Sequence, residues 1–292
     1  FYPELHKRTL ERMGYRFRMV IIDSFKKNRG AVMREIKFIK GKKTWAALIK
    51  GLVTAYELAH FIDDIQKKTE IAGAYEKREG ECYALYRELS DRLGRPDVNS
   101  AGAVRKLKKE YYGRLASVPV RAVKETDRIR IGVTGEIFVV IEPAANMSIA
   151  RALNSMGCEV YRSIYISEWI DHNFWPKFLA RSTDRHIIDA AKKYIKKNIG
   201  GHEQFNVGML MEYSRMGFEG AVHLMPFACL PELVTQSILP RLREELGLPV
   251  LSIALDEQTG TANNLTRLEA FVEMIRRKKR GVNSYEFCLS GN

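Results

Sequence analysis

Cys229 is the residue whose chemistry stands out first in this sequence. It follows a predicted strand at residues 220–224 and lies just ahead of a predicted helix at residues 231–246, which begins with a proline. Free backbone N–H groups and the helix dipole at such a position favour a thiolate or a negatively charged metal cluster. A lone cysteine is also often a small buried apolar residue, and both interpretations stay open at this point.

Two further loops are candidates because each follows a predicted strand, where parallel sheets bind their ligands. They cover residues 134–136 and 256–260, beside the Cys229 loop at residues 225–232. Neither carries a GxGxxG or Walker pattern, so a nucleotide cradle is only weakly supported there. The histidines show no metal-ligand spacing and are interpreted as satisfied or surface residues: His60, His172, His186, His202 and His223. No Ser/His/Asp order can be singled out.

The second half of the chain predicts a parallel α/β domain, because short strands alternate with helices. Strands are predicted at residues 129–133, 159–165, 220–224 and 249–254. Helices are predicted at residues 144–156, 184–197, 204–216, 231–246 and 265–277. The expected fold class is therefore α/β, with a Rossmann-like parallel sheet in the C-terminal domain.

The first half predicts a largely helical portion of an incomplete α/β domain. A helix at residues 5–13 and a strand at residues 15–22 would be half of a parallel α/β unit. Residues 31–116 are almost entirely helical in pattern, with Ser100 as the cap of a basic helix. We expect residues 1–116 to be the remainder of the first α/β domain with its helical subdomain, 117–128 a linker, 129–280 the second parallel α/β domain and 281–292 a flexible tail.

The positive charge lies almost wholly in the first half. The net charge is +13, and residues up to Arg128 hold 29 Lys and Arg against 17 Asp and Glu. Such a surface suits a polyanion, namely nucleic acid, an acidic partner protein or the phosphates of a coenzyme, unless it is only a solvated helical face. Nucleic acid is not favoured, because no RNP-type aromatic motif or recognition helix accompanies the charge.

Composition excludes several protein classes. With 46% hydrophobic and 28% charged residues, the chain is neither disordered nor collagen-like. Its four cysteines include no CxxC pair, which excludes a disulfide framework and a self-contained zinc site and predicts a reducing cytoplasm. No apolar run approaches the roughly 18 residues of a membrane helix. Because the sequence begins at Phe1 within a helical pattern, we expect that the start of the protein is missing.

Several stretches resemble the D-component family of 2-hydroxyacyl-CoA dehydratases, in particular relatives described as acyl-CoA dehydratase activase-related (CoA protein activase-like) proteins. The matching text is MPFACLPELVTQSILPRL (225–242), PVLSIALDEQTG (249–260), TRLEAFVEM (266–274), GEIFVVIEPAANMSIARALNSMGCEV (135–160), SEWI (167–170) and FYPELHKRTLERMGYRF (1–17). The resemblance is dense after residue 129 and looser across the helical middle.

The resemblance implies paired α/β domains that hold a 4Fe-4S cluster through cysteines on loops of different domains. Cys229 matches the C-terminal cluster ligand of this pattern, and the other ligands are expected upstream of residue 1. A closed cluster needs about four ligands, so this chain would supply one thiolate of a set. Cys82, Cys158 and Cys288 match no ligand position and are interpreted as structural.

The implied function is an iron-sulfur redox protein that accepts or relays low-potential electrons in an ATP-coupled, anaerobic system. Whether it is a dehydratase-like lyase or an electron-transfer component stays open. Partners would be an ATP-dependent activator or companion subunit and a CoA thioester. Glu136 or Glu257 would take a proton, and Asn146, Thr259 or Arg267 would orient substrate, although such residues are also common in caps and turns. The alternative is a non-catalytic α/β module that docks a partner protein through its basic half.

Overall fold

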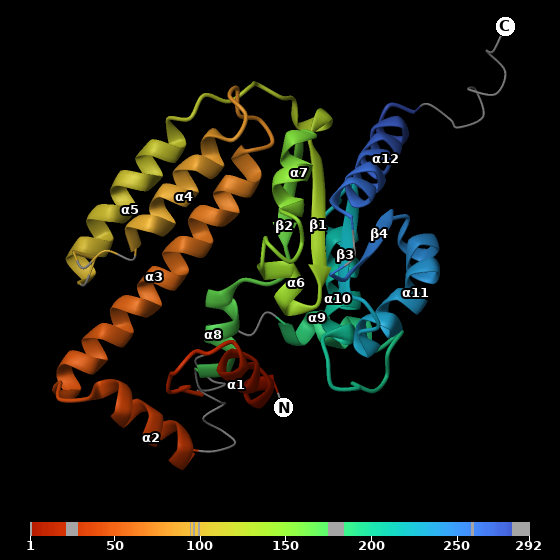
Figure 1. Ribbon diagram of the computed structural model, residues 1–292. Coiled ribbons are helices and arrows are strands. Elements are labelled where there is room, and N and C mark those ends of the chain that lie inside the picture. Colours follow the sequence, from red (N-terminus) through yellow and green to blue (C-terminus); the bar gives the residue numbers. More distant parts are fainter. Residues whose placement is uncertain are drawn as a thin grey trace, which may run out of the picture.

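The computed structural model describes residues 2–21, 29–93, 95, 97–98, 100–174, 184–257 and 260–281. Its first half contains the helices α1 (Tyr2–Arg12), α2 (Arg29–Lys40), α3 (Trp45–Ala72), α4 (Glu81–Leu93) and α5 (Ala101–Ala116). A 3-10 turn, η1 (Glu125–Asp127), then leads into an alternation of strands and helices (Figure 1).

Four parallel strands form the sheet of the second half, as the sequence predicts. They are β1 (Ile129–Gly135), β2 (Cys158–Arg162), β3 (Gly220–Pro226) and β4 (Val250–Leu255), in the spatial order β2-β1-β3-β4. In β1 and β3, successive side chains are buried on both faces. Continuous apolar strands of this kind are typical of parallel sheets that helices cover on both sides.

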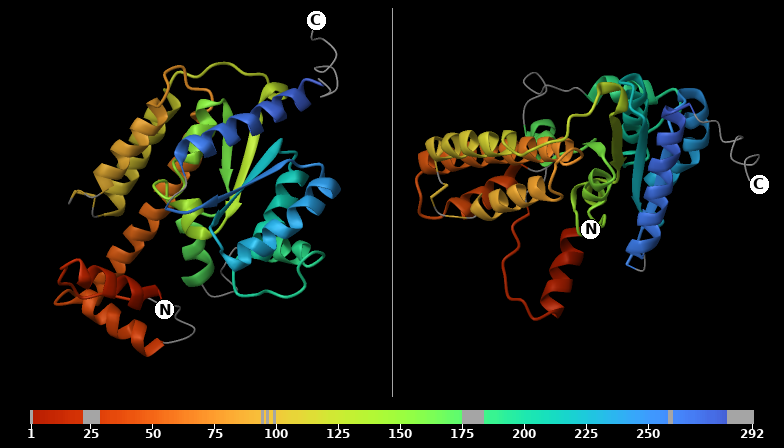
Figure 2. Two further views of the ribbon diagram at one scale, coloured as in Figure 1. Left: turned by 45° about the vertical axis from the view of Figure 1, so that its right-hand side comes forward. Right: turned by 90° about the horizontal axis from the view of Figure 1, so that it is seen from above.

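Helices cover both faces of this sheet (Figure 2). One apolar core joins the strands to α6 (Ile137–Ile141), α7 (Ile149–Ser155) and α12 (Thr261–Lys279). The other joins them to α9 (Asp184–Ala191), α10 (Glu203–Arg215) and α11 (Leu230–Leu246). The short helices α6 and α8 (Ile166–Phe174) were not predicted, because each has too few turns to show helical periodicity.

Helices α3, α4 and α5 form a separate bundle, here called the α3–α5 arm, around an apolar core of their own. The side chain of Ser100 accepts a hydrogen bond from the Ala103 N–H, which confirms the predicted cap of α5. Residues 117–128, predicted as a linker, begin along the loop between α3 and α4. There the Lys77 N–H donates to the Pro119 carbonyl at 2.8 Å, and the Arg121 N–H donates to the Tyr75 carbonyl at 2.7 Å.

A buried ion pair joins the arm to the sheet. The Arg162 guanidinium, at the end of β2, lies 2.9 Å from Oε1 of Glu70 on α3, and both side chains are at most 5% exposed. The Tyr165 hydroxyl donates to the same carboxylate at 3.0 Å, and the Asn154 amide donates to the Glu70 carbonyl at 2.7 Å. These bonds satisfy charged and polar groups that would otherwise be costly to bury, so they position the arm against β2.

The predicted strand at residues 15–22 is wrong. Residues 15–21 follow the turn at Gly14 without strand structure, and residue 22 lies outside the described residues. A strand needs a neighbour for its backbone hydrogen bonds, and the four-stranded sheet takes none from this part of the chain. Within the described residues 2–53, Val32 alone is buried. None of the described helices has the length and apolar character of a membrane span.

Candidate functional site

Cys229 lies at the carboxyl end of β3, where the chain turns into α11. The turn takes three residues: Ala228 has a left-handed backbone with φ +59°, and the Cys229 N–H donates to the Pro226 carbonyl at 3.1 Å. Cys229 is the N-cap residue of α11, and its carbonyl accepts from the Leu233 N–H at 2.9 Å. Its side chain is half-buried. The structure therefore places this cysteine at the edge where parallel sheets bind ligands.

Burial and two nearby carboxylates determine the pKa of the Cys229 thiol. Burial raises the pKa of this thiol above its ordinary value. The backbone N–H of Glu232 lowers it, while the carboxylates of Glu232 and Glu136 raise it. The lowering expected from a helix N-terminus is thus outweighed, and a metal ion would have to displace a proton to bind here.

Glu136 lies next to this turn because β1 and β3 are neighbouring strands. Its backbone N–H donates to the Leu224 carbonyl of β3 at 3.1 Å. Its carboxylate caps α6, since Oε2 accepts from the N–H groups of Phe138 and Val139 at 3.0 and 3.1 Å. Gly135 makes this close approach possible: its φ is +148°, and a Cβ there would lie 1.9 Å from the Leu224 carbonyl oxygen.

The other predicted site residues are more dispersed. Asn146 is 5% exposed, and both ends of its amide are used: Nδ2 donates to the Val139 carbonyl at 2.8 Å and Oδ1 accepts from the Ile149 N–H at 3.3 Å. Glu257 is exposed in the turn after β4. Thr259 lies outside the described residues.

Arg267 comes from α12 and reaches the middle of β4 rather than its end. Its guanidinium Nη2 donates to the Ser252 carbonyl at 2.7 Å. Ser252 is the third residue of that strand. Of the predicted residues, the structure therefore brings Cys229 and Glu136 together and leaves Glu257 at the same edge of the sheet.

A buried polar network lies beneath the Cys229 turn and was not predicted. The Thr134 hydroxyl donates to Asn206 Oδ1 at 2.8 Å, and the Asn206 amide donates to both Glu232 carboxylate oxygens at 2.9 Å. His223 Nε2 lies 2.7 Å from Glu232 Oε2, while its Nδ1 lies 3.0 Å from the Ser252 hydroxyl. All but Ser252 are at most 1% exposed.

This network, here called the Glu232 network, anchors the first turn of α11 and hence the cysteine at its N-cap. Its members come from β1, β3, β4, α10 and α11. From the sequence, His223 is interpreted as a hydrogen-bonded or surface histidine. The structure shows that it is buried and hydrogen-bonded. The sequence feature that could have indicated this network is the presence of polar residues within mainly apolar segments, namely Thr134, His223 and Glu232.

The loops beyond the strands, here called the carboxyl edge, carry charge of one sign. They comprise residues 136–144, 163–171, 227–234 and 256–257 and contain no Lys or Arg. Their carboxylates are Glu136, Glu142, Glu168, Asp171, Glu232, Asp256 and Glu257. Large apolar side chains are exposed beside Cys229, with Phe227 at 70%, Leu230 at 65% and Phe138 at 61%. This edge suits an apolar or cationic contact better than a phosphate group.

The described residues do not form a complete metal site. Among them, no three His, Cys, Asp or Glu side chains group so as to hold a metal ion. Cys82 lies in the core of the arm and Cys158 at the start of β2; burial raises the pKa of each thiol to about 12. Cys288 lies outside the described residues. One thiol at the carboxyl edge is short of the roughly four ligands that an iron-sulfur cluster needs.

The comparisons agree with the family resemblance seen in the sequence. A family model described as 2-hydroxyglutaryl-CoA dehydratase, D-component, matches residues 95–275. The matched region contains α5, the whole sheet and the Cys229 turn. No curated protein matches the chain.

Proposed function

Because the chain belongs to the 2-hydroxyglutaryl-CoA dehydratase D-component family, we propose that it is an iron-sulfur redox protein that accepts or relays low-potential electrons in an ATP-coupled system. In this proposal Cys229 supplies one thiolate to a 4Fe-4S cluster. The remaining ligands come from outside the described residues, since these hold no second cysteine at the carboxyl edge.

One observation carries this proposal: of the three described cysteines, only Cys229 is accessible, and it stands at the carboxyl edge inside the family match. Cys82 and Cys158 are fully buried. The exposed apolar side chains around Cys229 suit a second protein surface that would bring further ligands and exclude water.

A cluster held in this way would supply one-electron chemistry. The contribution of this chain is geometry: the Glu232 network orients the turn, and Glu136 adds a carboxylate that two backbone N–H groups hold in place. We favour Glu136 over Glu257 as the group that would take a proton near this site, because the Phe138 and Val139 N–H groups hold its carboxylate in place whereas Glu257 is exposed in the turn after β4.

The substrate roles proposed for Asn146, Thr259 and Arg267 find unequal support. Asn146 is buried, and both the nitrogen and the oxygen of its amide form hydrogen bonds with backbone groups of α6 and α7, which favours a structural role. Arg267 is exposed beside β4 and keeps guanidinium N–H groups for an anion. A CoA thioester, another proposed partner, would have to place its phosphates away from the carboxyl-edge loops, because these contain no Lys or Arg and Lys67, which reaches them from α3, pairs with Glu168 at 2.6 Å.

Iron and acid-labile sulfide per chain, measured after anaerobic purification from the native source, test the proposal. The wild-type protein is expected to carry both, with the visible absorption of a cluster. Cys229→Ser should lose them, whereas Cys288→Ser, which removes a cysteine that matches no ligand position, should keep them. Unchanged iron in Cys229→Ser would overturn the assignment.

A second candidate function is docking of a partner protein through the basic half. Residues 5–53 expose large apolar side chains: Leu5, Leu10, Met13, Tyr15, Phe17, Ile21, Met33, Phe38, Ile39, Trp45, Ile49, Leu52 and Val53. The same region is rich in Lys and Arg, so an acidic surface with apolar side chains would complement it. This function predicts a protein that binds no iron yet holds an acidic partner in a salt-sensitive complex.

A further inference from the structure

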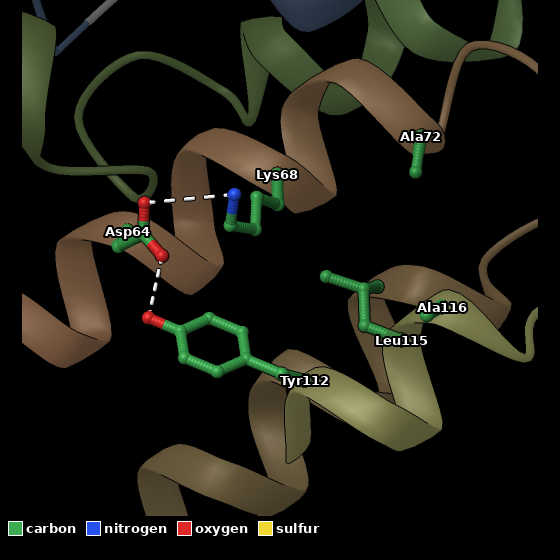
Figure 3. A pocket seen from close by; sticks show the side chains of 6 residues that line it. All are labelled: Asp64, Lys68, Ala72, Tyr112, Leu115 and Ala116. Carbon is green, nitrogen blue, oxygen red and sulfur yellow. Dashed lines mark hydrogen bonds and ion pairs between the residues drawn. The ribbon is translucent and has the colours of Figure 1, made fainter. Parts of the chain in front are cut away.

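A groove on the α3–α5 arm is a hollow in the described part of the molecule that the proposed function leaves unused. It measures about 610 Å³ and opens between α3 and α5 (Figure 3). Its lining residues are Asp64, Lys68, Ala72, Tyr112, Leu115 and Ala116. This volume lies in the range of about 300–1,000 Å³ that small-molecule sites occupy.

The groove combines an apolar floor with one polar corner. Ala72, Ala116 and Leu115 form the apolar floor of the groove. Tyr112 forms an aromatic wall, and its ring packs edge-on against the Phe61 ring with 5.5 Å between the ring centres. The Tyr112 hydroxyl donates to Asp64 Oδ2 at 2.5 Å. Lys68 Nζ lies 3.8 Å from the other oxygen of that carboxylate, too far for a hydrogen bond, so the ammonium keeps its donors for another acceptor.

Cations surround this aromatic pair. Lys68 Nζ lies 5.9 Å from the centre of the Tyr112 ring, and Lys108 Nζ lies 5.9 Å from the centre of the Phe61 ring. Arg105 and Lys109 precede Tyr112 by seven and three residues, so they share its face of α5.

Most cations of α5 have no carboxylate partner among the described residues. In the part of the chain that the structure describes, no ion pair forms at Arg105, Lys106, Lys108 or Lys109. Arg114, one turn beyond, contrasts with them because it forms two hydrogen bonds of 2.6 Å with Glu88. Three of these cations, Arg105, Lys108 and Lys109, lie on the face of α5 that carries Tyr112, whereas Lys106 lies on another face.

We propose that the groove between α3 and α5 binds a nucleoside phosphate, with the base and sugar along Tyr112 and the two alanines and the phosphates on Lys68 and Lys108. An apolar floor, an aromatic wall and adjacent ammonium groups match the three parts of such a ligand. Asp64 offers a carboxylate oxygen to a sugar hydroxyl or a base amine. None of these residues belongs to the carboxyl edge, so the inference stands whether or not Cys229 binds a cluster.

The phosphate could come from a free nucleotide or from the nucleotide end of coenzyme A, and the probes separate the two. Isothermal titration of the full chain would use ATP, coenzyme A, adenosine 3′,5′-bisphosphate, adenosine and tripolyphosphate. Tighter binding of ATP would assign a free nucleotide, and tighter binding of coenzyme A together with the bisphosphate would assign the coenzyme. Tripolyphosphate that binds as tightly as either would overturn the nucleoside assignment, as would a single-stranded RNA that displaces both.

Variants locate the site. Lys68→Gln with Lys108→Gln removes two ammonium groups, and Ala116→Trp fills the groove without changing charge. Each should weaken binding at least about tenfold. Lys106→Gln is the matched control: it removes one charge from the same helix on a different face and should leave the dissociation constant within about twofold. Equal losses in all variants, or none with Ala116→Trp when circular dichroism shows a folded protein, would overturn the proposal.

Discussion

The carboxyl edge of the sheet and the α3–α5 arm differ in the sign and the pairing of their charged residues. The edge carries carboxylates alone and buries one of them, Glu232, in a complete hydrogen-bond network. The arm leaves four cations of α5 without a carboxylate partner in the described structure. The cations of α5 and the carboxylates of the edge therefore lie in different parts of one chain.

The two regions also differ in how tightly their residues are constrained. At the edge, Gly135 and the Glu232 network meet atoms from several elements, while the exposed positions of the arm meet few. Substitutions at the edge should therefore cost much more stability than substitutions on the arm.

Removal of Glu232 should have the largest effect. Glu232→Ala leaves the Asn206 amide and His223 without their acceptor in a dry environment and should lower the free energy of unfolding by about 3–5 kcal/mol. Urea denaturation would measure the change. Glu244→Gln, an exposed carboxylate on the same helix, should change it by less than about 0.5 kcal/mol. Equal effects would mean that the network contributes no particular stability.

A pair of glycine substitutions should move stability in opposite directions. Gly135→Ala places a Cβ against the Leu224 carbonyl at an unfavourable φ and should cost about 2–4 kcal/mol. Gly113→Ala, inside α5 with no atom within 4 Å of the new Cβ, should gain about 0.5–1 kcal/mol. Thermal unfolding followed by circular dichroism would measure both, and a stable Gly135→Ala would contradict the close approach of β1 and β3.

The arm should lose a small part of its stability in acid. The hydrogen bond from Arg114, followed by that from Tyr111, lowers the pKa of Glu88 to about 2 from its ordinary value of 4.5. A lowered folded-state pKa contributes stability above pH 4.5 that is lost as the pH falls toward 2. Because this pair is half-exposed, its share is at most about 1 kcal/mol.

Urea titrations between these pH values would compare the wild type with Glu88→Gln. The variant should show a flatter decline of stability toward acid, because it lacks the titrating carboxylate. Parallel curves for the two proteins would show that the Glu88–Arg114 pair adds nothing measurable.

The smallest expected effect concerns the reactivity of Cys229. Burial is the main cause of its raised pKa, and Glu136 adds to it, so Glu136→Gln should lower that pKa, increase the thiolate fraction and speed alkylation a few-fold at pH 8. Peptide mapping by mass spectrometry would follow Cys229 separately from the other cysteines. Glu142→Gln, at the end of α6, serves as the charge-matched control, and an equal acceleration there would contradict a local effect.

Local pattern predicted most of the sheet domain. The alternation of apolar strands with helices predicted four parallel strands, and the succession of strand, turn and Pro231 placed Cys229 at a helix start. Glu136 was selected because it follows β1. The strand predicted at residues 15–22 is wrong, because polar and apolar residues alternate there as in a strand but no described strand pairs with residues 15–21.

The class of fold, the strand ends at which Cys229 and Glu136 lie, and the family resemblance could all be predicted from the amino-acid sequence. Tertiary structure alone decided that Glu136 lies against Leu224 of β3, that Glu232 joins Asn206 and His223, and that Tyr112 meets Asp64 across the groove. The physical reason is range: periodicity and capping depend on residues a few positions apart, whereas these contacts join residues 9 to 48 positions apart or depend on neighbouring strands.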